Sequence, residues 1–120
     1  MILVTGGAGF IGSNLVNFLS SNQNDEIVSV DLNNKKNKNY FSSENVIKID
    51  PSDLPNFLKK NKNKIKIIIH LGAITSTIEK NVKLIIKTNI DLSIYIWNWC
   101  VKYKKRLIYA SSAATYGDGS

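Results

Sequence analysis

The chain contains few of the residues that build disulfide or metal scaffolds. One cysteine, one histidine and one arginine occur among its 120 residues. Because Cys100 stands alone, a disulfide framework is excluded and a reducing compartment, the cytoplasm, is expected. His70 has no cysteine or carboxylate at ligand spacing, so the sequence offers neither a metal site nor a histidine-based triad. We therefore interpret His70 as a packed residue at a strand end.

Long apolar runs are absent as well. None approaches the roughly 20 residues that a membrane-spanning helix needs, and glycines interrupt the apolar start of the chain directly after Thr5. We therefore expect neither a membrane span nor a signal peptide. The length suits one domain with a single modest core, and no internal repeat or interdomain linker is present.

Acidic residues are outnumbered, with nine against sixteen basic ones and a net charge of +7. Such a balance invites a nucleic-acid interpretation. Fifteen of the basic residues are lysines, however, and many lie in Asn/Lys tracts at 33–39 and 59–66. No aromatic residues stand between these lysines to stack on bases. The sequence therefore predicts a solvated basic surface and no nucleic-acid partner.

The most informative feature is the glycine-rich stretch Thr5–Gly12, which follows the apolar run Met1–Val4 and opens an apolar, helix-like stretch. A buried strand that passes through such a turn into a helix is typical of a dinucleotide-binding fingerprint. Gly6 would allow the sharp turn, Gly9 the approach of a pyrophosphate, and Gly12 close packing of helix on strand. The helix start, with Phe10 and Ile11, would offer N–H groups and partial positive charge to phosphates. The alternative is a glycine-rich turn that binds nothing.

An acidic residue stands at the distance that the fingerprint requires. Asp31 follows the apolar run Ile27–Val30 and lies 19 residues after Gly12. A carboxylate there accepts hydrogen bonds from the adenosine ribose, and it favours the free 2′-hydroxyl of NAD over the 2′-phosphate of NADP.

Strand-like and helix-like segments alternate along the chain. Expected strands cover 2–5, 27–31, 46–49, 65–70 and 106–111, and expected helices cover about 11–21, a short segment capped by Ser52 or Asp53 and ending near 61, and about 81–103. The long helix is inferred from apolar residues spaced three or four apart, at Val82, Ile85, Ile86, Ile90, Ile94, Trp97 and Val101. The polar stretch 33–44 is expected to form a surface loop. The alternation predicts an α/β fold, a Rossmann-type doubly wound parallel sheet in the order 3-2-1-4-5 with helices on both faces.

Ligands of such sheets bind beyond the carboxyl ends of the strands. Asp50 follows the third strand, where it would reach such a ligand or merely end the strand before Pro51. Leu71, Gly72 and Ala73 follow the fourth strand and are expected to line the cofactor, because small residues permit close backbone approach. The polar residues 75–77 would contact ribose or substrate, or cap the next helix.

Together, Thr5–Gly12, Asp31, His70–Ala73 and Tyr109–Gly117 resemble the extended short-chain dehydrogenase/reductase family, whose members are mostly epimerases and dehydratases of nucleotide sugars. Within it, the stretch from His70 to Glu79, Leu92-Ser93 with Trp97–Cys100, and Tyr109–Gly119 are similar to the ADP-heptose 6-epimerases. The resemblance implies a nucleotide-sugar substrate and NADP as cofactor, with NAD possible because of Asp31. It adds further cofactor contacts and a set of substrate contacts. The cofactor contacts are Leu32, Ile74, Thr75, Asn89 and, at the adenine amino group, Asp50, and the substrate contacts are Ser112, Thr77 and Glu79. Asn89 matches an asparagine that the family keeps inside the long helix, where it would tie the fourth strand to its neighbours or only face solvent.

The chemistry that the resemblance implies is inversion of C6 of ADP-D-glycero-D-manno-heptose by transient oxidation, for lipopolysaccharide core synthesis. Ser112 matches the serine that hydrogen-bonds the reacting oxygen, whereas the Tyr-x-x-x-Lys pair of the family is missing. We therefore expect a truncated dinucleotide-binding domain over 1–120, the N-terminal portion of a longer homo-oligomeric enzyme, inactive on its own. Alternatives are a UDP-sugar 4-epimerase, a sugar dehydratase, or a non-catalytic remnant or sensor.

Overall fold

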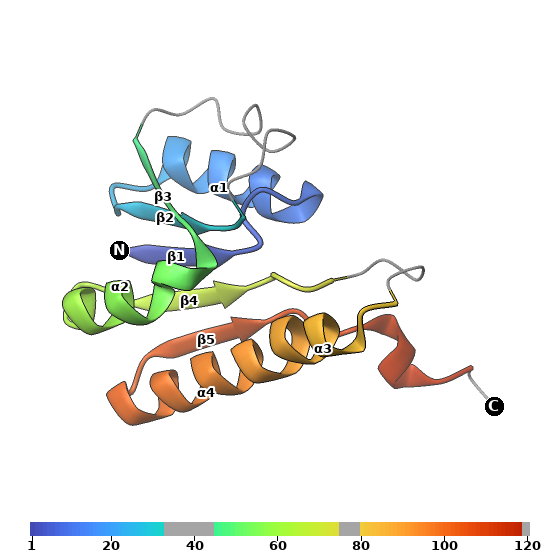
Figure 1. The fold of residues 1–120 in the computed structure, drawn as a ribbon. Coiled ribbons are helices and arrows are strands. Elements are labelled where there is room, and N and C mark those ends of the chain that lie inside the picture. Colours follow the sequence, from blue (N-terminus) through green and yellow to red (C-terminus); the bar gives the residue numbers. More distant parts are fainter. Residues whose placement is uncertain (33–44, 75–79, 119–120) are drawn as a thin grey trace.

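A computed structural model of the chain describes residues 1–32, 45–74 and 80–118. Its centre is a five-stranded sheet in the order β3-β2-β1-β4-β5, in which every neighbouring pair is parallel (Figure 1). The strands are β1 (Ile2–Thr5), β2 (Ile27–Val30), β3 (Val46–Ile49), β4 (Ile67–His70) and β5 (Arg106–Tyr109). The strand order predicted from the sequence is confirmed.

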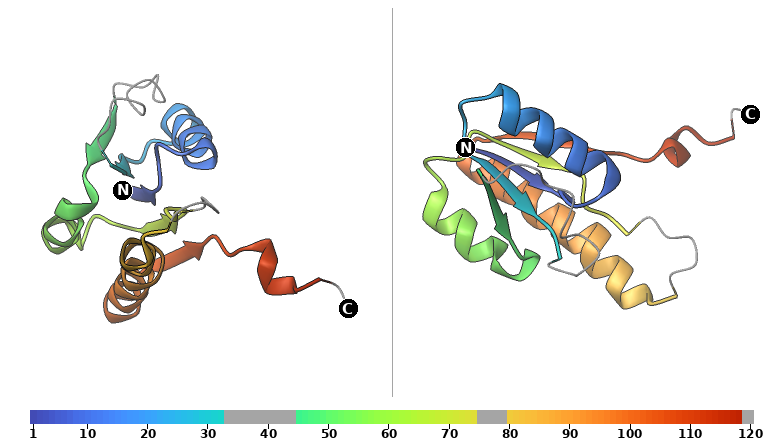
Figure 2. Two further views of the ribbon diagram at one scale, coloured as in Figure 1. Left: turned by 45° about the vertical axis from the view of Figure 1, so that its right-hand side comes forward. Right: turned by 90° about the horizontal axis from the view of Figure 1, so that it is seen from above.

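Helices cover both faces of the sheet, as expected for this class of fold (Figure 2). The helical segments of the described residues are α1 (Phe10–Asn22), η2 (Pro51–Asp53), α2 (Leu54–Asn61), α3 (Val82–Ile85), η3 (Ile86–Asp91), α4 (Leu92–Tyr103) and η4 (Ala113–Tyr116). One face packs against α1 through Val16, and the other packs against α2 and α4 through residues such as Leu58 and Ile96.

The alternation of side chains along β1 and β4 builds these two core layers. Leu3 and Ile68 point toward α2 and α4, whereas Val4 and Ile69 point toward α1. Because both faces are covered, the strands are apolar almost without interruption, which is typical of parallel sheets. The carboxyl ends of β1, β2 and β4 therefore meet at one edge, where the expected site residues follow.

The long helix expected over about 81–103 is divided into three segments. Between α3 and α4 the chain widens into the π-helical η3, where the N–H of Leu92 bonds the carbonyl of Lys87, five residues earlier. Such insertions are frequent at functional sites. Most of the apolar stripe that predicted this helix faces solvent: Ile94, Trp97 and Val101 are 55, 60 and 64% exposed.

Several element ends differ from the expected ones. β4 begins at Ile67 rather than at 65, because β1 pairs with it only from Ile2 onward. β2 ends at Val30 and β5 at Tyr109, each slightly before the expected end. Asp53 is the N-cap residue of α2, one of the two residues expected there, but its side chain makes no capping bond. The preceding turn η2 is capped by Asp50, which accepts from the N–H of Ser52. The loop expected at 33–44 lies outside the described residues.

The chain leaves the sheet after β5. The N–H of Ala110 still bonds the carbonyl of His70, and the following segment with η4 projects away from the strands (Figures 1 and 2). Among the described residues, no helix combines the length and the apolar character that crossing a bilayer demands.

Candidate functional site

The turn after β1 requires a glycine at its first position. Gly6 has a φ of +69°, in the left-handed region that favours glycine. A Cβ on Gly6 would lie 2.7 Å from both Cα and N of Gly72, so the turn rests directly on the backbone that follows β4. The N–H of Gly6 also bonds the carbonyl of Val30 on β2, 2.9 Å away. The sharp turn predicted for Gly6 is present.

Gly12 brings α1 against this turn. A Cβ at Gly12 would lie 2.0 Å from the carbonyl oxygen of Gly6, a distance that no real Cβ tolerates. Gly9 differs, because its added Cβ would meet only the Gly6 oxygen, at 3.3 Å. Close packing therefore explains why residue 12 is a glycine, but it does not explain the glycine at position 9. The absence of a Cβ on Gly9 leaves space on the side of the turn where the sequence predicts a phosphate.

The start of α1 has the features of an anion site. Gly9 is the N-cap residue and makes no side-chain capping bond, and the first N–H groups of a helix have no partner within it. Phe10 and Ile11, the first two helical residues, are 83 and 69% exposed. Unused N–H groups with the positive end of the helix dipole match a phosphate, so the residues present fit a dinucleotide.

Asp31 is joined to the glycine turn. Its Oδ2 accepts from the N–H of Ala8 at 2.9 Å, and its Oδ1 accepts from the N–H of Leu32 at 2.7 Å. These two bonds orient a half-buried carboxylate beside the turn, at the end of β2. Leu32 is 61% exposed next to it. The arrangement suits a carboxylate that accepts ribose hydroxyls.

The segment after β4 lies on the other side of the turn. The N–H of Leu71 bonds the carbonyl of Thr5 at 3.2 Å, which extends the pairing of β4 with β1. The side chain of Asn89, in η3, accepts from the N–H of Ile74 at 2.7 Å and donates to its carbonyl at 3.0 Å. Asn89 therefore ties this segment to the long helix, and the alternative that it only faces solvent is wrong. Ala73 is exposed between them.

His70 is a packed strand-end residue, as interpreted from the sequence. It is 2% exposed, and its ring lies 5.7 Å from that of Tyr109 on β5. Nδ1 contacts the hydroxyl of Thr5 at 2.5 Å, and Nε2 contacts that of Ser93 at 2.9 Å. Burial lowers the pKa of His70 below its ordinary value of 6.5. From the sequence, no role was assigned to Thr5 or Ser93. The signals that could have indicated one are the hydroxyl of Thr5 at a strand end and the position of Ser93 four residues after Asn89.

Two further predicted site residues, Asp50 and Ser112, cap helical turns in the structure. Asp50 accepts from both the N–H and the hydroxyl of Ser52, so it serves as a cap at the end of β3. Ser112 is exposed and caps η4 by accepting from the N–H of Ala114 at 3.2 Å. Thr75, Thr77 and Glu79 lie outside the described residues.

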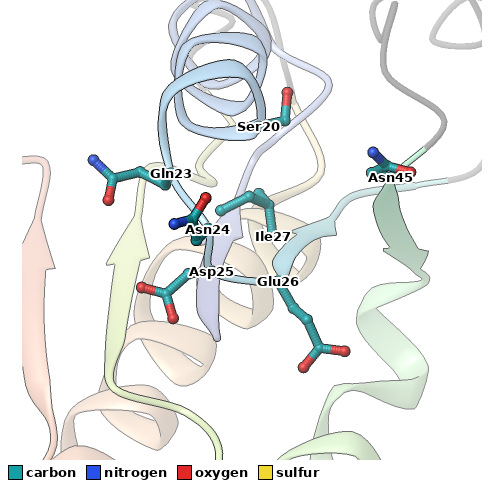
Figure 3. Close-up of a pocket in the computed structure, with 7 residues that line it drawn as sticks. All are labelled: Ser20, Gln23, Asn24, Asp25, Glu26, Ile27 and Asn45. Atoms are coloured by element: carbon teal, nitrogen blue, oxygen red, sulfur yellow. The ribbon is translucent and has the colours of Figure 1, made fainter.

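A separate hollow lies at the opposite edge of the sheet, between the end of α1 and the starts of β2 and β3 (Figure 3). Its volume is about 240 Å³. Asp25 on its wall bonds Lys66 at 2.8 Å and the amino group of Met1 at 3.2 Å, and these bonds lower the pKa of its carboxyl group, Lys66 contributing most. The carboxylate is already paired, so the hollow offers little to a ligand. The described part of the chain also contains no cluster of side chains able to hold a metal ion.

The chain matches a known family along almost its whole length. The sequence profile of the NAD dependent epimerase/dehydratase family matches residues 2–120. The ADP-L-glycero-D-manno-heptose-6-epimerase of Brachyspira hyodysenteriae is 43% identical over 99% of this chain, and that of Fusobacterium nucleatum is 39% identical over 99%.

Solved structures of two epimerases are also similar to the chain. The ADP-L-glycero-D-manno-heptose-6-epimerase of Helicobacter pylori is similar with a TM-score of 0.76, 34% identity and 97% of this chain covered. The UDP-glucuronic acid 4-epimerase of Bacillus cereus, solved with NAD, has a TM-score of 0.82 and 27% identity over 99% of this chain. The chain spans less than half the length of each of these proteins. It covers 40 and 42% of the two solved structures, and 39 and 37% of the relatives from Brachyspira and Fusobacterium. A family match over almost every residue nevertheless settles the assignment: the chain belongs to the NAD dependent epimerase/dehydratase family.

Proposed function

We propose that these residues form the cofactor-binding part of a nucleotide-sugar epimerase that inverts C6 of ADP-D-glycero-D-manno-heptose, in lipopolysaccharide core synthesis. The single observation that carries the proposal is the junction at the carboxyl edge, where the Gly6 turn contacts Gly72 and Asp31 bonds Ala8. Relatives named as heptose epimerases, up to 43% identical, support the choice of substrate.

In this proposal, the described residues bind and orient a nicotinamide dinucleotide. The N–H groups at the start of α1 hold the pyrophosphate, with Gly9 leaving room for it. Asp31 accepts the ribose hydroxyls, and the backbone of Gly72 and Ala73 borders the nicotinamide end. When bound, the nicotinamide ring supplies reversible hydride transfer, which allows a sugar carbon to invert without net oxidation.

The form of the cofactor depends on the surroundings of Asp31. The resemblance implies NADP. Lysines 35, 36 and 38 would either reach a 2′-phosphate or belong to a solvated loop, and they lie outside the described residues. The Asp31 carboxylate, held at the end of β2 by two N–H groups, favours NAD instead. The UDP-glucuronic acid 4-epimerase of Bacillus cereus, a structural neighbour solved with NAD, makes both forms worth comparing directly.

The chemical step needs groups that this sequence does not contain. Ser112 is the proposed hydrogen-bond donor to the reacting oxygen, but none of the five tyrosines is followed by a lysine four residues later. We therefore propose that a Tyr-x-x-x-Lys pair follows in a longer protein, and that the 120-residue chain alone binds cofactor without turnover.

Product analysis of the longer protein tests the substrate. Incubation with ADP-D-glycero-D-manno-heptose is expected to give the C6 epimer, and incubation with UDP-galactose is expected to give no product. Ser112→Ala should lower kcat on the order of a hundredfold, while Ser111→Ala serves as the matched control. Turnover of UDP-galactose alone would assign the chain to a sugar 4-epimerase, and turnover of neither sugar would support a cofactor-binding remnant or sensor.

The proposal includes self-association and a cytoplasmic location. An apolar stripe runs along η3 and α4, and its members are 49 to 64% exposed: Ile90, Ile94, Trp97 and Val101. Large exposed apolar surfaces mark association sites. We propose that this stripe meets a second subunit in the longer protein. The single buried thiol of Cys100 agrees with a reducing cytoplasm.

A further inference from the structure

A chain of hydrogen bonds connects β1, β4 and the long helix next to the glycine turn. The N–H of Gly72 lies 3.1 Å from Oγ1 of Thr5, and this hydroxyl lies 2.5 Å from Nδ1 of His70. Nε2 of His70 lies 2.9 Å from Oγ of Ser93, which lies 2.8 Å from the carbonyl oxygen of Asn89. The chain thus joins the segment after β4 to β1, to β4 itself and to the long helix.

The two ends determine the direction of every bond. A backbone carbonyl can only accept, so the single proton of the Ser93 hydroxyl is donated to Asn89. Ser93 must then accept from Nε2 of His70, which carries a proton. A neutral ring has an unprotonated Nδ1, so that atom accepts from the hydroxyl of Thr5. At the other end, Thr5 accepts from the N–H of Gly72, which can only donate.

This closed arrangement selects one state of the histidine. The Nε2–H tautomer satisfies both ring nitrogens, whereas the Nδ1–H tautomer would leave Nε2 facing Ser93 without a proton to share. A buried polar group without a partner is costly, and His70 is 2% exposed. All polar side-chain atoms that are buried in the described residues have partners.

The same residues hold the backbone that faces the glycine turn. Gly72 is held by Thr5, and two residues later Ile74 is held by the side chain of Asn89, whose carbonyl ends the chain. Gly72 is so close to Gly6 that a Cβ added at Gly6 would overlap it. The separation of these two backbones therefore depends on hydrogen bonds made several residues away.

We propose that Thr5, His70 and Ser93 are positioning residues for the cofactor site. Their one-way chain of hydrogen bonds fixes His70 as the neutral Nε2–H tautomer and holds the Gly72 backbone at its place beside the Gly6 turn. Thr5 and His70 are each 2% exposed, so in this proposal they act through the backbone of Gly72. The part of this inference that concerns binding rests on the proposed function, whereas the tautomer and the restraint on Gly72 do not.

The test begins without cofactor, on the uniformly ¹⁵N-labelled chain. His70 is the only histidine, so its ring nitrogens are identified in a long-range ¹H–¹⁵N spectrum without assignment. Near neutral pH, we expect a protonated Nε2 and an unprotonated Nδ1. The Nδ1–H tautomer, or an average of the two, would overturn the proposal.

Variants then test the restraint. Thr5→Val replaces the hydroxyl with a methyl group of similar size, and we expect exchange of the Gly72 amide with solvent to become about tenfold faster or more. Thr5→Ser should restore slow exchange. Ser93→Ala should release the tautomer into a mixture, whereas Ser20→Ala should not. Ser20 is the matched control, because its hydroxyl also donates to a helix carbonyl, that of Asn17, without a histidine partner.

Cofactor titration separates this inference from the proposed function. With a binding-competent chain, Thr5→Val and Ser93→Ala should each raise the Kd of NADH or NADPH about tenfold, with Thr5→Ser and Ser20→Ala near the unmodified value. Unchanged Kd values in both variants would overturn the positioning role while the proposed function stands. No binding by the unmodified chain would overturn the proposed function, and the tautomer and exchange measurements would still decide the hydrogen-bond chain.

Discussion

Gly12 lies directly on the carbonyl of Gly6, with no room for a Cβ between α1 and the turn that follows β1. Gly9, three residues earlier, has much more space. The two glycines therefore serve different purposes, one within the fold and one toward the site. Substituting alanine at each of the two positions separates these purposes.

Gly12→Ala is expected to destabilise the fold by about 1–3 kcal/mol, because the new methyl group forces α1 away from the turn. Gly9→Ala should change the free energy of unfolding by less than about 1 kcal/mol, since its backbone is extended and its Cβ meets one atom at 3.3 Å. Gly9→Ala should nevertheless weaken dinucleotide binding. Urea unfolding and NADH titration of both variants measure this, and equal stability losses would contradict it.

Asp31→Asn should move cofactor preference toward NADP. The carboxylate beside the glycine turn repels a 2′-phosphate and accepts from a free ribose, so its loss should change the ratio of the two dissociation constants on the order of tenfold. Asp53→Asn is the control, because it removes the same charge at a position that makes no side-chain capping bond. An unchanged ratio would show that Asp31 does not face the ribose.

The stability of the chain should fall as pH decreases through the ordinary pKa of histidine. Burial lowers the pKa of His70 from 6.5, so below this pH the unfolded chain binds a proton that the folded chain does not. The contribution of neutral His70 to the free energy of unfolding is fully present above about pH 6.5, and it declines as the pH falls toward the lower pKa of the folded state. The pKa of Asp25 is lowered from 3.8, so its contribution is lost only in more acidic solution.

Urea midpoints measured from about pH 8 to pH 5 test this statement. The side chains around the ring are the hydroxyls of Thr5 and Ser93 and the ring of Tyr109. In His70→Gln, the slope in this range should become flatter, whatever the loss of total stability. A slope of the same size in the variant would contradict the assignment to His70.

The two tryptophans of α4 should respond in opposite ways. Trp99 is 8% exposed and packs on Tyr103, with ring centres 5.1 Å apart, whereas Trp97 is 60% exposed. Trp99→Ala should cost about 3–5 kcal/mol of stability, and Trp97→Ala little. In the longer protein, Trp97→Ala should instead weaken self-association in sedimentation experiments. Intact association in that variant would remove Trp97 from the proposed subunit contact.

The fold followed from sequence periodicity because each strand is a short apolar run before a turn or polar residue. The order of the strands came from the right-handed rule for parallel crossovers. Periodicity was less informative for α4, because this helix is apolar on nearly all sides. The stripe through Ile94 and Trp97 predicted a helix, but Ile96 and Cys100 face the core. The π-helical segment has no signature in periodicity.

The site was predictable where one residue type has one physical use. Gly6 and Gly12 occupy positions that a Cβ cannot occupy, and Asp31 lies where a carboxylate joins the turn. Thr5 and Ser93 were not found, because a hydroxyl has many uses and their contacts with His70 span 65 and 23 residues of sequence. The catalytic role of Ser112 remains a prediction. Its place after β5 follows from the sequence, whereas its role depends on residues beyond those described.

The central claim is that these residues bind a nicotinamide dinucleotide at the glycine turn. Calorimetric titration of the folded 120-residue chain with NADH and with NADPH tests it most directly. We expect saturable binding of at least one of the two, with one molecule per chain, and weaker binding by Gly9→Ala at unchanged stability. A chain that unfolds cooperatively in urea yet shows no saturable binding of either dinucleotide would contradict the account.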